Sequence, residues 1–185
     1  GLAVADMAAR RQHHHRQPLH FRIGPQCRQD LEPRAPGQHQ IQDQQIGPRL
    51  AQLGLGVMMH SGARRLRHAI LSNLVADLGE TCNLTMLHET EVLYLDRLEA
   101  PWPLRLDLKP GSHVPAHCSA SGKLLLAMLP REQRAALVRT LKLERFTPNT
   151  ITDPELLEAE LDRTAHKRIA IDNEEFVAGI ACVAA

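Results

Sequence analysis

A run of small residues, Ser119-Ala120-Ser121-Gly122-Lys123, directly precedes an apolar segment that extends from Leu124 to Leu129. This pattern is typical of a helix that begins at the small residues, and the first turn of a helix has backbone N–H groups without partners inside the helix. Together with the helix dipole, these groups favour an anion such as a carboxylate. The same small residues would also allow close packing of the helix on a sheet, and the sequence favours neither interpretation.

A second segment is acidic: Asp172-Asn173-Glu174-Glu175, followed by the β-rich run 180–184, with Cys182 ten residues after Asp172. Acidic residues in a turn are usually solvated or accept hydrogen bonds from nearby backbone N–H groups. Asp172 differs because it directly follows the apolar run 169–171, so we expect it at a strand end, where the mouth of a pocket would lie. Together the two segments indicate a domain that binds a small molecule and reports its presence.

The other reactive residues do not match a catalytic motif. The pair Gly122-Lys123 lacks the preceding Gly and the following Ser or Thr of a phosphate-binding loop, because His117 and Leu124 occupy those positions. His117 and Cys118 are adjacent, and adjacent side chains on an extended strand point to opposite faces, so they cannot form a thiol–imidazole pair directly. We therefore predict that Cys118 and Cys182 are buried and unreactive, and we predict no catalytic residue.

Histidine spacing argues against a metal site. His113 and His117 would share a face only on a helix, and Pro115 between them opposes a helix. The tract His13-His14-His15 lies between Arg and Gln residues with no acid or Cys nearby, which is typical of a solvated polar segment. We predict neither a metal ion nor a cofactor.

The composition limits the class of protein. A chain of 185 residues with 43% hydrophobic residues can form one domain with an appendage, and one Trp, one Tyr and three Phe leave a mainly aliphatic core. The net charge of +1 does not indicate a nucleic-acid or membrane surface. No apolar stretch approaches the roughly 20 residues that cross a bilayer. The four cysteines show no CxxC spacing and follow no signal peptide, so we expect a cytoplasmic protein with reduced thiols.

The composition changes near residue 46. Residues 1–45 are rich in Gln, His and Arg, and no helical or alternating apolar period extends from Gln12 to Gln45. We predict that residues 1–45 are a low-complexity, disordered segment, and DNA read out of frame would give a similar composition. Residues 46–61 have the spacing of a linker helix, and residues 62–185 predict the folded domain.

Apolar periodicity and turn residues predict the elements of this domain. The expected helices are Pro48–His60, Ala63–Leu78, Ser121–Leu129, Arg131–Leu141, and one with a capping box from Thr152 to Glu155 and Pro in its first turn. The expected strands are Cys82–His88, Val92–Leu98, Leu104–Leu108, Ile169–Asp172 and Gly179–Ala185. This order predicts an α+β domain with helices packed on a sheet. Because Ala185 lies inside the last expected strand, whose edge would stay open, we expect the domain to be cut short there.

Six segments occur in the order and spacing of one protein family. They are Gly79-Glu80-Thr81, Val92–Arg97, Gly111–His117, Ser119–Lys123, Phe146–Thr152 and Asp172–Cys182. In these segments the chain resembles, from about Ile46 to Ala185, the effector-binding domain of IclR-type bacterial transcriptional regulators. The resemblance implies a GAF-like α+β domain, a mixed or antiparallel sheet flanked by helices, that binds a small organic acid or aromatic metabolite. It also implies an N-terminal winged helix-turn-helix that binds promoter DNA, and assembly into homodimers or tetramers.

The resemblance also assigns effector contacts to six positions. These positions are Leu106, Val114, Ala120, Ser121, Asp172 and Cys182. On this assignment, helix N–H groups at Ala120 and Ser121 hold a carboxylate, Leu106 and Val114 form apolar walls, and Asp172 accepts a hydrogen bond from a hydroxyl group.

Three features depart from the family pattern. Arg168 stands four residues before Asp172, where the family usually has Gly or Ala, so a tight helix-to-strand turn would be strained there. The family continues beyond Ala185 with elements that complete the pocket, and residues 1–45 lack a recognisable winged helix. We therefore expect a truncated effector-binding domain that does not itself bind DNA specifically.

The leading functional prediction is small-molecule sensing in a DNA-binding transcriptional regulator. One alternative is a stand-alone sensing and dimerisation fragment that does not bind DNA. The other alternative is an enzyme, a thiol- or carboxylate-dependent hydrolase that acts on a small acid, and turnover of small esters would reveal it.

Overall fold

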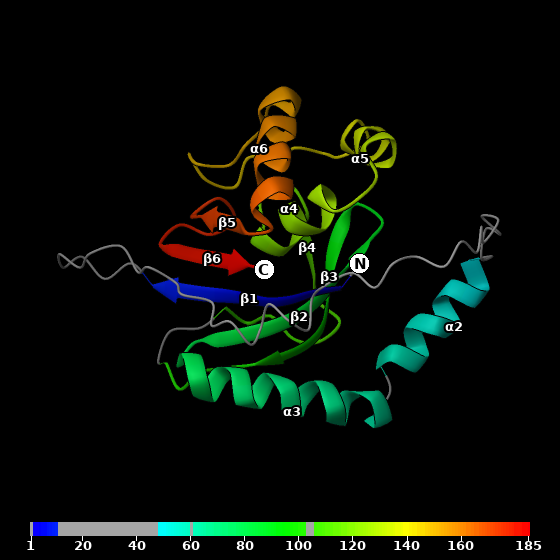
Figure 1. Ribbon diagram of the computed structural model, residues 1–185, viewed down its shortest axis with the longest axis vertical. Helices are drawn as coiled ribbons and strands as arrows, with labels where there is room; N and C mark the ends of the chain where they lie inside the picture. Colours follow the sequence, from blue (N-terminus) through cyan, green and yellow to red (C-terminus); the bar gives the residue numbers. More distant parts are fainter. Residues whose placement is uncertain (1, 11–47, 60, 103–105) are drawn as a thin grey trace. The chain divides into compact units, whose positions relative to one another are not determined.

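The computed structural model describes residues 2–10, 48–59, 61–102 and 106–185 (Figure 1). The chain divides into two compact units, Gly1–Arg11 with Leu55–Ala185, and Gln12–Gly54. The first unit contains the sheet, and in the second the described residues are the beginning of one helix. The predictions for the tract at 13–15, for Cys27 and for disorder over 11–45 concern positions outside the described residues.

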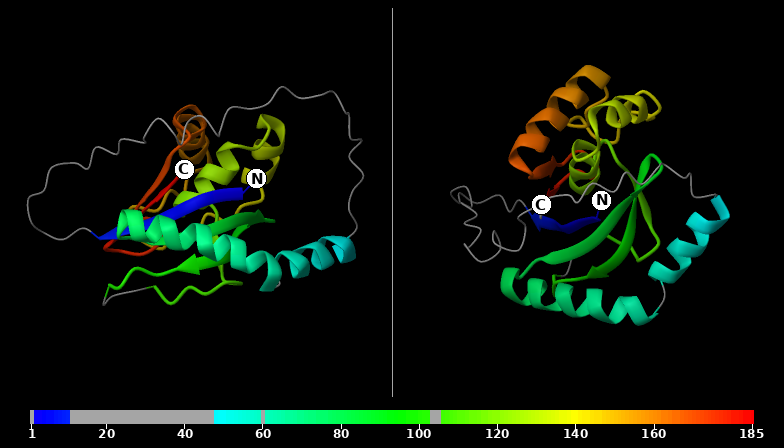
Figure 2. Two further views of the ribbon diagram at one scale, coloured as in Figure 1. Left: turned by 60° about the horizontal axis from the view of Figure 1, so that its bottom comes forward. Right: turned by 45° about the vertical axis from the view of Figure 1, so that its right-hand side comes forward.

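The first unit is built on an antiparallel sheet with the strand order β4-β3-β2-β1-β6-β5. The strands are β1 Leu2–Arg10, β2 Thr81–His88, β3 Glu91–Leu98, β4 His113–Pro115, β5 Ala170–Asn173 and β6 Ile180–Ala184. The helices are α2 Pro48–Met59, α3 Ser61–Leu78, α4 Ala120–Ala127, α5 Arg131–Val138 and α6 Pro154–Lys167. Helix α3 covers one face of the sheet, and α4 and α6 lie on the other face (Figures 1 and 2). The predicted α+β class is confirmed. None of the described helices is both long and apolar enough to span a membrane.

Strand β1 lies between β2 and β6 and is antiparallel to both. In this register Ala8 is opposite Thr81 on one side and Cys182 on the other. The prediction of disorder over residues 1–45 is therefore wrong for Leu2–Arg10, whose short apolar run suits a strand with neighbours on both edges. Strand β6 is consequently paired on both sides, so the expected open edge of the last strand is also wrong.

Helix α4 is the central element of the core, because every residue from Ala120 to Ala127 is buried. Its apolar side chains belong to one buried cluster with Val92 and Val114 of the sheet and with Leu157 and Leu161 of α6. The side chains that this cluster joins are mainly aliphatic, as the composition predicts. The core therefore holds the start of α4 in a fixed position on the sheet.

The third predicted strand, Leu104–Leu108, is not formed at residues 106–108, which are the part of it that the structure describes. Strand β4 pairs with β3 instead. The turn before β4 continues this pairing, because the Gly111 N–H donates to the Tyr94 carbonyl at 2.8 Å and the Tyr94 N–H donates to the Ser112 carbonyl at 3.0 Å. This turn occupies the hydrogen-bonding edge of β3 that the predicted strand would need.

Helix α6 begins at a different cap from the one predicted. The Asp153 carboxylate accepts hydrogen bonds from the Glu155 N–H at 2.7 Å and the Leu156 N–H at 3.2 Å. The Thr152 hydroxyl instead accepts a hydrogen bond from Arg145 at 2.9 Å. The capping box from Thr152 to Glu155 is therefore wrong, because a carboxylate one residue closer to the helix meets its first N–H groups. The predicted Pro in the first turn is confirmed.

A β-bulge in β3 directs Asp96 toward helix α3. The pairing with β2 skips Leu95, and an extra residue of this kind changes the face on which the following side chains lie. Asp96 is fully buried, with Oδ1 at 3.8 Å from Arg64 Nε and Oδ2 at 3.6 Å from His68 Nδ1. These two side chains of α3 therefore connect the helix to the sheet.

Candidate ligand site between helix α4 and the acidic turn

Helix α4 begins in close contact with the chain that leaves β4. The Ser119 hydroxyl caps the helix, since its Oγ accepts a hydrogen bond from the Gly122 N–H at 3.3 Å and donates to the Pro115 carbonyl at 2.9 Å. A Cβ atom on Gly122 would collide with the backbone of Ala116, so only glycine fits there. Close packing therefore explains Gly122, and it keeps the first turn, 120–121, fully buried.

The acidic turn between β5 and β6 is held by Asp172. Its Oδ1 accepts hydrogen bonds from the Glu175 N–H at 2.7 Å and the Phe176 N–H at 3.4 Å, so the carboxylate caps the turn that follows it. Asp172 is 4% exposed. The prediction that Asp172 lies at a strand end is confirmed. The expectation that the mouth of a pocket lies at this residue stays a prediction, because the side chain is buried and bonded to backbone in this structure.

Two threonines from the segment Phe146–Thr152 fix the same turn from outside. The Thr147 hydroxyl donates to the Glu174 carbonyl at 2.6 Å, and the Thr150 hydroxyl donates to the Glu175 carbonyl at 2.6 Å. Thr150 Oγ1 also accepts a hydrogen bond from the Thr147 N–H at 2.8 Å. This segment, which the sequence identifies only as a family motif, therefore acts as a clamp on the acidic turn.

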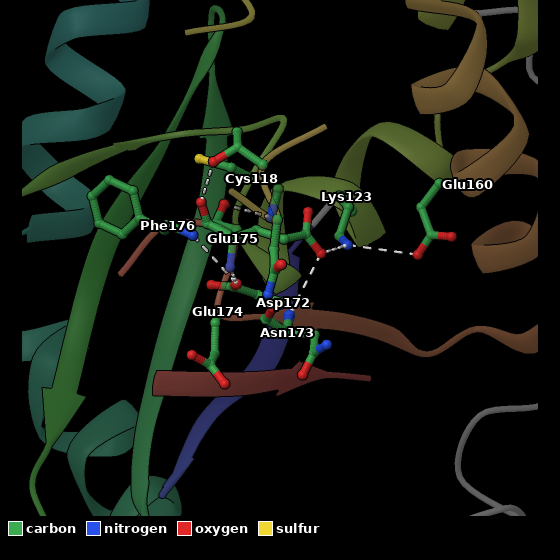
Figure 3. A network of polar contacts seen from close by, with 12 residues as sticks. Cys118, Lys123, Glu160, Asp172, Asn173, Glu174, Glu175 and Phe176 are labelled. Carbon is green, nitrogen blue, oxygen red and sulfur yellow. Dashed lines mark hydrogen bonds and ion pairs between the residues drawn. The ribbon is translucent and has the colours of Figure 1, made fainter. Parts of the chain in front are cut away.

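Lys123 and Glu175 form a buried ion pair between α4 and the acidic turn (Figure 3). Lys123 Nζ lies 2.5 Å from Glu175 Oε1 and 3.5 Å from Glu160 Oε1, and Lys123 is 1% exposed. This pair is not among the site residues predicted from the sequence. The sequence contains one signal for this pair, because Lys123 is followed directly by an apolar run and its side chain is therefore expected to be buried. A buried ammonium group requires a charged partner.

Burial raises the pKa values of both carboxyl groups in this cluster. The pKa of Asp172 rises from its ordinary 3.8 to about 6, mainly through burial and also through the charge of Glu175, while the backbone N–H groups oppose the rise. Burial likewise raises the pKa of Glu175, and the neighbouring Lys123 opposes this rise. The cluster therefore combines two buried acids with one ammonium group, so it has more acceptors than donors.

Cys118 lies beside this cluster but does not have the properties of a nucleophile. Burial, followed by the charges of Asp172 and Glu175, raises the pKa of its thiol to about 12. The His117 Nε2–H donates to the Glu144 carbonyl at 3.0 Å, which fixes the orientation of the ring. Burial lowers the pKa of His117, which keeps the ring neutral. Cys118 and Cys182 are buried, as predicted, and no disulfide joins the three cysteines that the structure describes.

Five of the six predicted contact residues come from elements that meet around the start of α4. Val114, Ala120 and Cys182 belong to the same buried cluster. Asp172 is directly opposite Cys182 in the register of β5 and β6, and Ser121 is buried in the first turn of α4. The structure therefore brings together residues that lie far apart in the sequence.

Leu106, the sixth residue, lies on the loop before β4. It is half-buried, and its carbonyl accepts a hydrogen bond from Arg97 Nη2 at 3.3 Å. Among the described residues of this loop, Leu108 packs against the buried cluster. The position of Leu106 is therefore fixed through its backbone by β3.

An open hollow of about 450 Å³ lies elsewhere, on helix α3, and is lined by Arg64, Arg65, His68 and Ala69. All four residues belong to one helix. A ligand site usually has polar groups that converge from several elements. We therefore place the candidate site at α4 and the acidic turn, where β4, β5, β6 and α4 supply its residues.

Comparison with known proteins identifies the family. Residues 57–185 match the family described as bacterial transcriptional regulator IclR C-terminal. The chain is similar to the probable transcriptional regulator SauR of Cupriavidus necator, with 52% identity over 136 residues, which cover 74% of this chain and 54% of that protein. It spans about half the length of the curated relatives that it matches.

Solved structures agree with this match. The crystal structure of Thermotoga maritima IclR has a TM-score of 0.64 and 32% identity, covering 73% of this chain and 55% of that chain. An IclR homologue from Microbacterium hydrocarbonoxydans, solved with 4-hydroxybenzoate, has a TM-score of 0.57 and 27% identity, covering 75% of this chain and 63% of that chain. The chain belongs to the IclR family of bacterial transcriptional regulators, and its folded part is the effector-binding domain of that family.

Proposed function

We propose that this domain senses a small carboxylic acid on behalf of a transcriptional regulator, with the acid held between the start of α4 and the acidic turn. The observation that carries the proposal is the meeting of these two segments in a buried position, with Asp172 opposite Cys182 and both beside the α4 cluster. The dipole of α4 contributes about 0.3–1 kcal/mol toward an anion at its first turn.

The charges of the site determine how the acid is oriented. A carboxylate lies against Ala120 and Ser121, where the helix dipole favours it. Asp172, with a pKa of about 6, is mostly ionised at neutral pH and would repel the same carboxylate, so it faces a donor group. A relative solved with 4-hydroxybenzoate, which has a carboxylate and a hydroxyl group, supports a ligand of this kind.

Binding at this place requires a local opening of the domain. Val114, Ala120 and Ser121 are at most 1% exposed. Leu106 and Val114 then form the apolar walls of the site, and Cys182 lies between them and Asp172. Exclusion of water by these walls strengthens each hydrogen bond to the ligand.

Calorimetric titration with 4-hydroxybenzoate tests the proposal. Ser121→Leu fills the first turn and should abolish binding, while Asp172→Ala should weaken it by about 1–3 kcal/mol because a ligand donor loses its acceptor. Thr140→Leu adds a similar volume at an exposed position and is the matched control. Urea unfolding checks that each variant folds. If both site variants bind as the parent does, the ligand lies elsewhere.

We further propose that the chain self-associates into a homodimer or tetramer. Leu50, Leu53 and Val57 on α2, and Leu66 and Ile70 on α3, are all exposed large apolar side chains. Spacings of three and four residues place such side chains on one helix face, which a second copy would cover. Sedimentation equilibrium is the direct check, and a purely monomeric chain would contradict the proposal.

Promoter DNA is the proposed partner of the full-length regulator, in the cytoplasm. Residues 46–185 contain 16 Lys and Arg against 17 Asp and Glu, a difference of −1, so this part does not itself attract DNA. A stand-alone sensing and dimerisation fragment is the alternative for the chain by itself, and a salt-resistant operator shift would exclude that alternative. The raised pKa of the Cys118 thiol opposes the hydrolase alternative.

A further inference from the structure

One carboxylate oxygen of Glu175 accepts hydrogen bonds, and the other has no hydrogen-bond partner among the described residues. Oε1 lies 2.5 Å from Lys123 Nζ and 3.5 Å from the Asn173 N–H. Oε2 is buried, and the described part of the chain offers it no hydrogen-bond partner. Glu175 is 6% exposed. A buried carboxylate oxygen without a donor costs free energy unless another molecule supplies the donor.

The position of this carboxylate is fixed from three directions. The Thr150 hydroxyl holds the Glu175 carbonyl, and Asp172 Oδ1 accepts from the Glu175 N–H. Lys123 holds Oε1 and itself belongs to the buried first turns of α4, two residues after Ser121. In the close-up, the Glu175 carboxylate lies beside Lys123 and near Asp172 (Figure 3). The unbonded oxygen is therefore held within the candidate site and is not free to turn toward water.

The described groups around Glu175 do not donate a hydrogen bond to its Oε2, so a donor would have to come from a bound molecule. Lys123 serves two carboxylates, Glu175 and Glu160, and it is the ammonium group that α4 contributes. Asp172 is an acceptor that already uses the backbone N–H groups of the turn. The Cys118 thiol donates toward the Pro115 carbonyl. Of these three side chains, Asp172 is a hydrogen-bond acceptor, and the donors of Lys123 and Cys118 are already used by other acceptors.

We propose that Glu175 is a specificity-determining residue of this site, whose Oε2 accepts a hydrogen bond from the hydroxyl group of a bound hydroxylated carboxylic acid. Lys123 is the positioning residue that holds Glu175 in place. This inference rests on the proposed function, because it requires an acid with its carboxylate at the start of α4. It assigns the recognition of the hydroxyl group to Glu175 in addition to Asp172.

The test compares 4-hydroxybenzoate with benzoate, which lacks the hydroxyl group, by calorimetry. The parent chain should prefer 4-hydroxybenzoate by about tenfold or more. Glu175→Gln should reduce this preference to within about threefold by weakening 4-hydroxybenzoate, with benzoate affinity little changed. The double variant Lys123→Met with Glu175→Met removes both buried charges, leaves no unpaired ion, and should lose the preference as well.

Glu160→Gln is the matched control, because it removes a second carboxylate partner of Lys123 at the rim and should keep the preference. Retention of the preference in both Glu175 variants, with its loss in Asp172→Asn, would overturn the role of Glu175 and leave the proposed function standing. Equal affinity of the parent for the two acids would also overturn it. Failure of the parent to bind either acid would count against the proposed function itself and this inference with it.

Discussion

Asp172 holds the acidic turn, and it is also one of the residues to which we assign ligand binding. Its Oδ1 accepts two backbone N–H groups, which fixes the acidic turn. The same burial that makes these bonds strong disfavours the ionised carboxylate, and the pKa rises to about 6. The folded state therefore holds the Asp172 proton more tightly than the unfolded state does, so stability depends on pH.

The sign of this dependence gives a prediction for Asp172→Asn. In the parent, the stability linked to the Asp172 proton is present below about pH 4 and is lost as pH rises through about 6. The asparagine keeps an oxygen acceptor for the turn and does not titrate. Its stability relative to the parent should therefore increase from pH 4 to pH 7, by about 2–3 kcal/mol. Urea unfolding at four pH values between 4 and 7 measures this difference.

Asp162→Asn is the control. The hydrogen bond from Arg134 holds the pKa of Asp162 below its ordinary value of 3.8, so the parent loses this contribution only as pH falls below that value, and the difference between this variant and the parent should stay nearly constant from pH 4 to pH 7. A difference between Asp172→Asn and the parent that stays constant with pH would show that Asp172 is not held protonated by the fold.

Residue roles were predictable where they depend on neighbours in the sequence. The position of Asp172 at a strand end and the opening of a helix near Ser119 both follow from local patterns. The ion pair of Lys123 with Glu175 joins residues 52 positions apart, so no local pattern contains it. The sequence also left open whether the small residues around Gly122 serve anion binding or close packing. The contact of Gly122 with Ala116 that explains the glycine depends on how the chain folds back.

The junction between α6 and β5 is the element in which this chain differs from its family pattern. Arg168, the C-cap of α6, has φ 54° and ψ 28°, a left-handed conformation that glycine adopts without strain. Its side chain is exposed, so replacement removes little packing. Arg168→Gly should therefore raise the free energy of unfolding by about 0.5–1 kcal/mol.

Urea unfolding compares this variant with Ala159→Gly, an exposed position inside the same helix that should cost about 1 kcal/mol. Opposite effects of the two glycines would show that the backbone conformation at Arg168 is strained. A loss of stability at both positions would contradict that account.

Elements with strong local periodicity were predicted closely. The hairpin of β2 and β3 and the helices α3 and α4 match the expected ranges within a few residues. Strand β1 was missed because its short apolar run is followed by a long polar segment, and its partners lie more than 70 residues away. The strand expected at Leu104–Leu108 is wrong at residues 106–108, because the turn before β4 already forms hydrogen bonds with the edge of β3. No local pattern in the sequence indicates which segment pairs with that edge.

At the scale of the molecule, three of the six family segments have a physical role at the candidate site. The segment Ser119–Lys123 forms the start of α4, which packs closely on Ala116 because residue 122 is a glycine. The segment Phe146–Thr152 holds the acidic turn through the hydroxyl groups of its threonines. The segment Asp172–Cys182 forms the β5–β6 hairpin whose first carboxylate caps its own turn. Lys123, Thr147 and Thr150 join the first two segments to the acidic turn of the third, so the three segments fix one another in position.

The central claim is that a carboxylic acid binds between α4 and the acidic turn, and an amide NMR titration of the chain with 4-hydroxybenzoate tests it most directly. The account predicts that the largest shift changes occur in residues 119–123 and 172–176, with smaller changes in β4 and β6. The hollow on α3 beside Arg64 and His68 provides the internal comparison. Largest changes on α3, or saturation without changes at the acidic turn, would contradict the account.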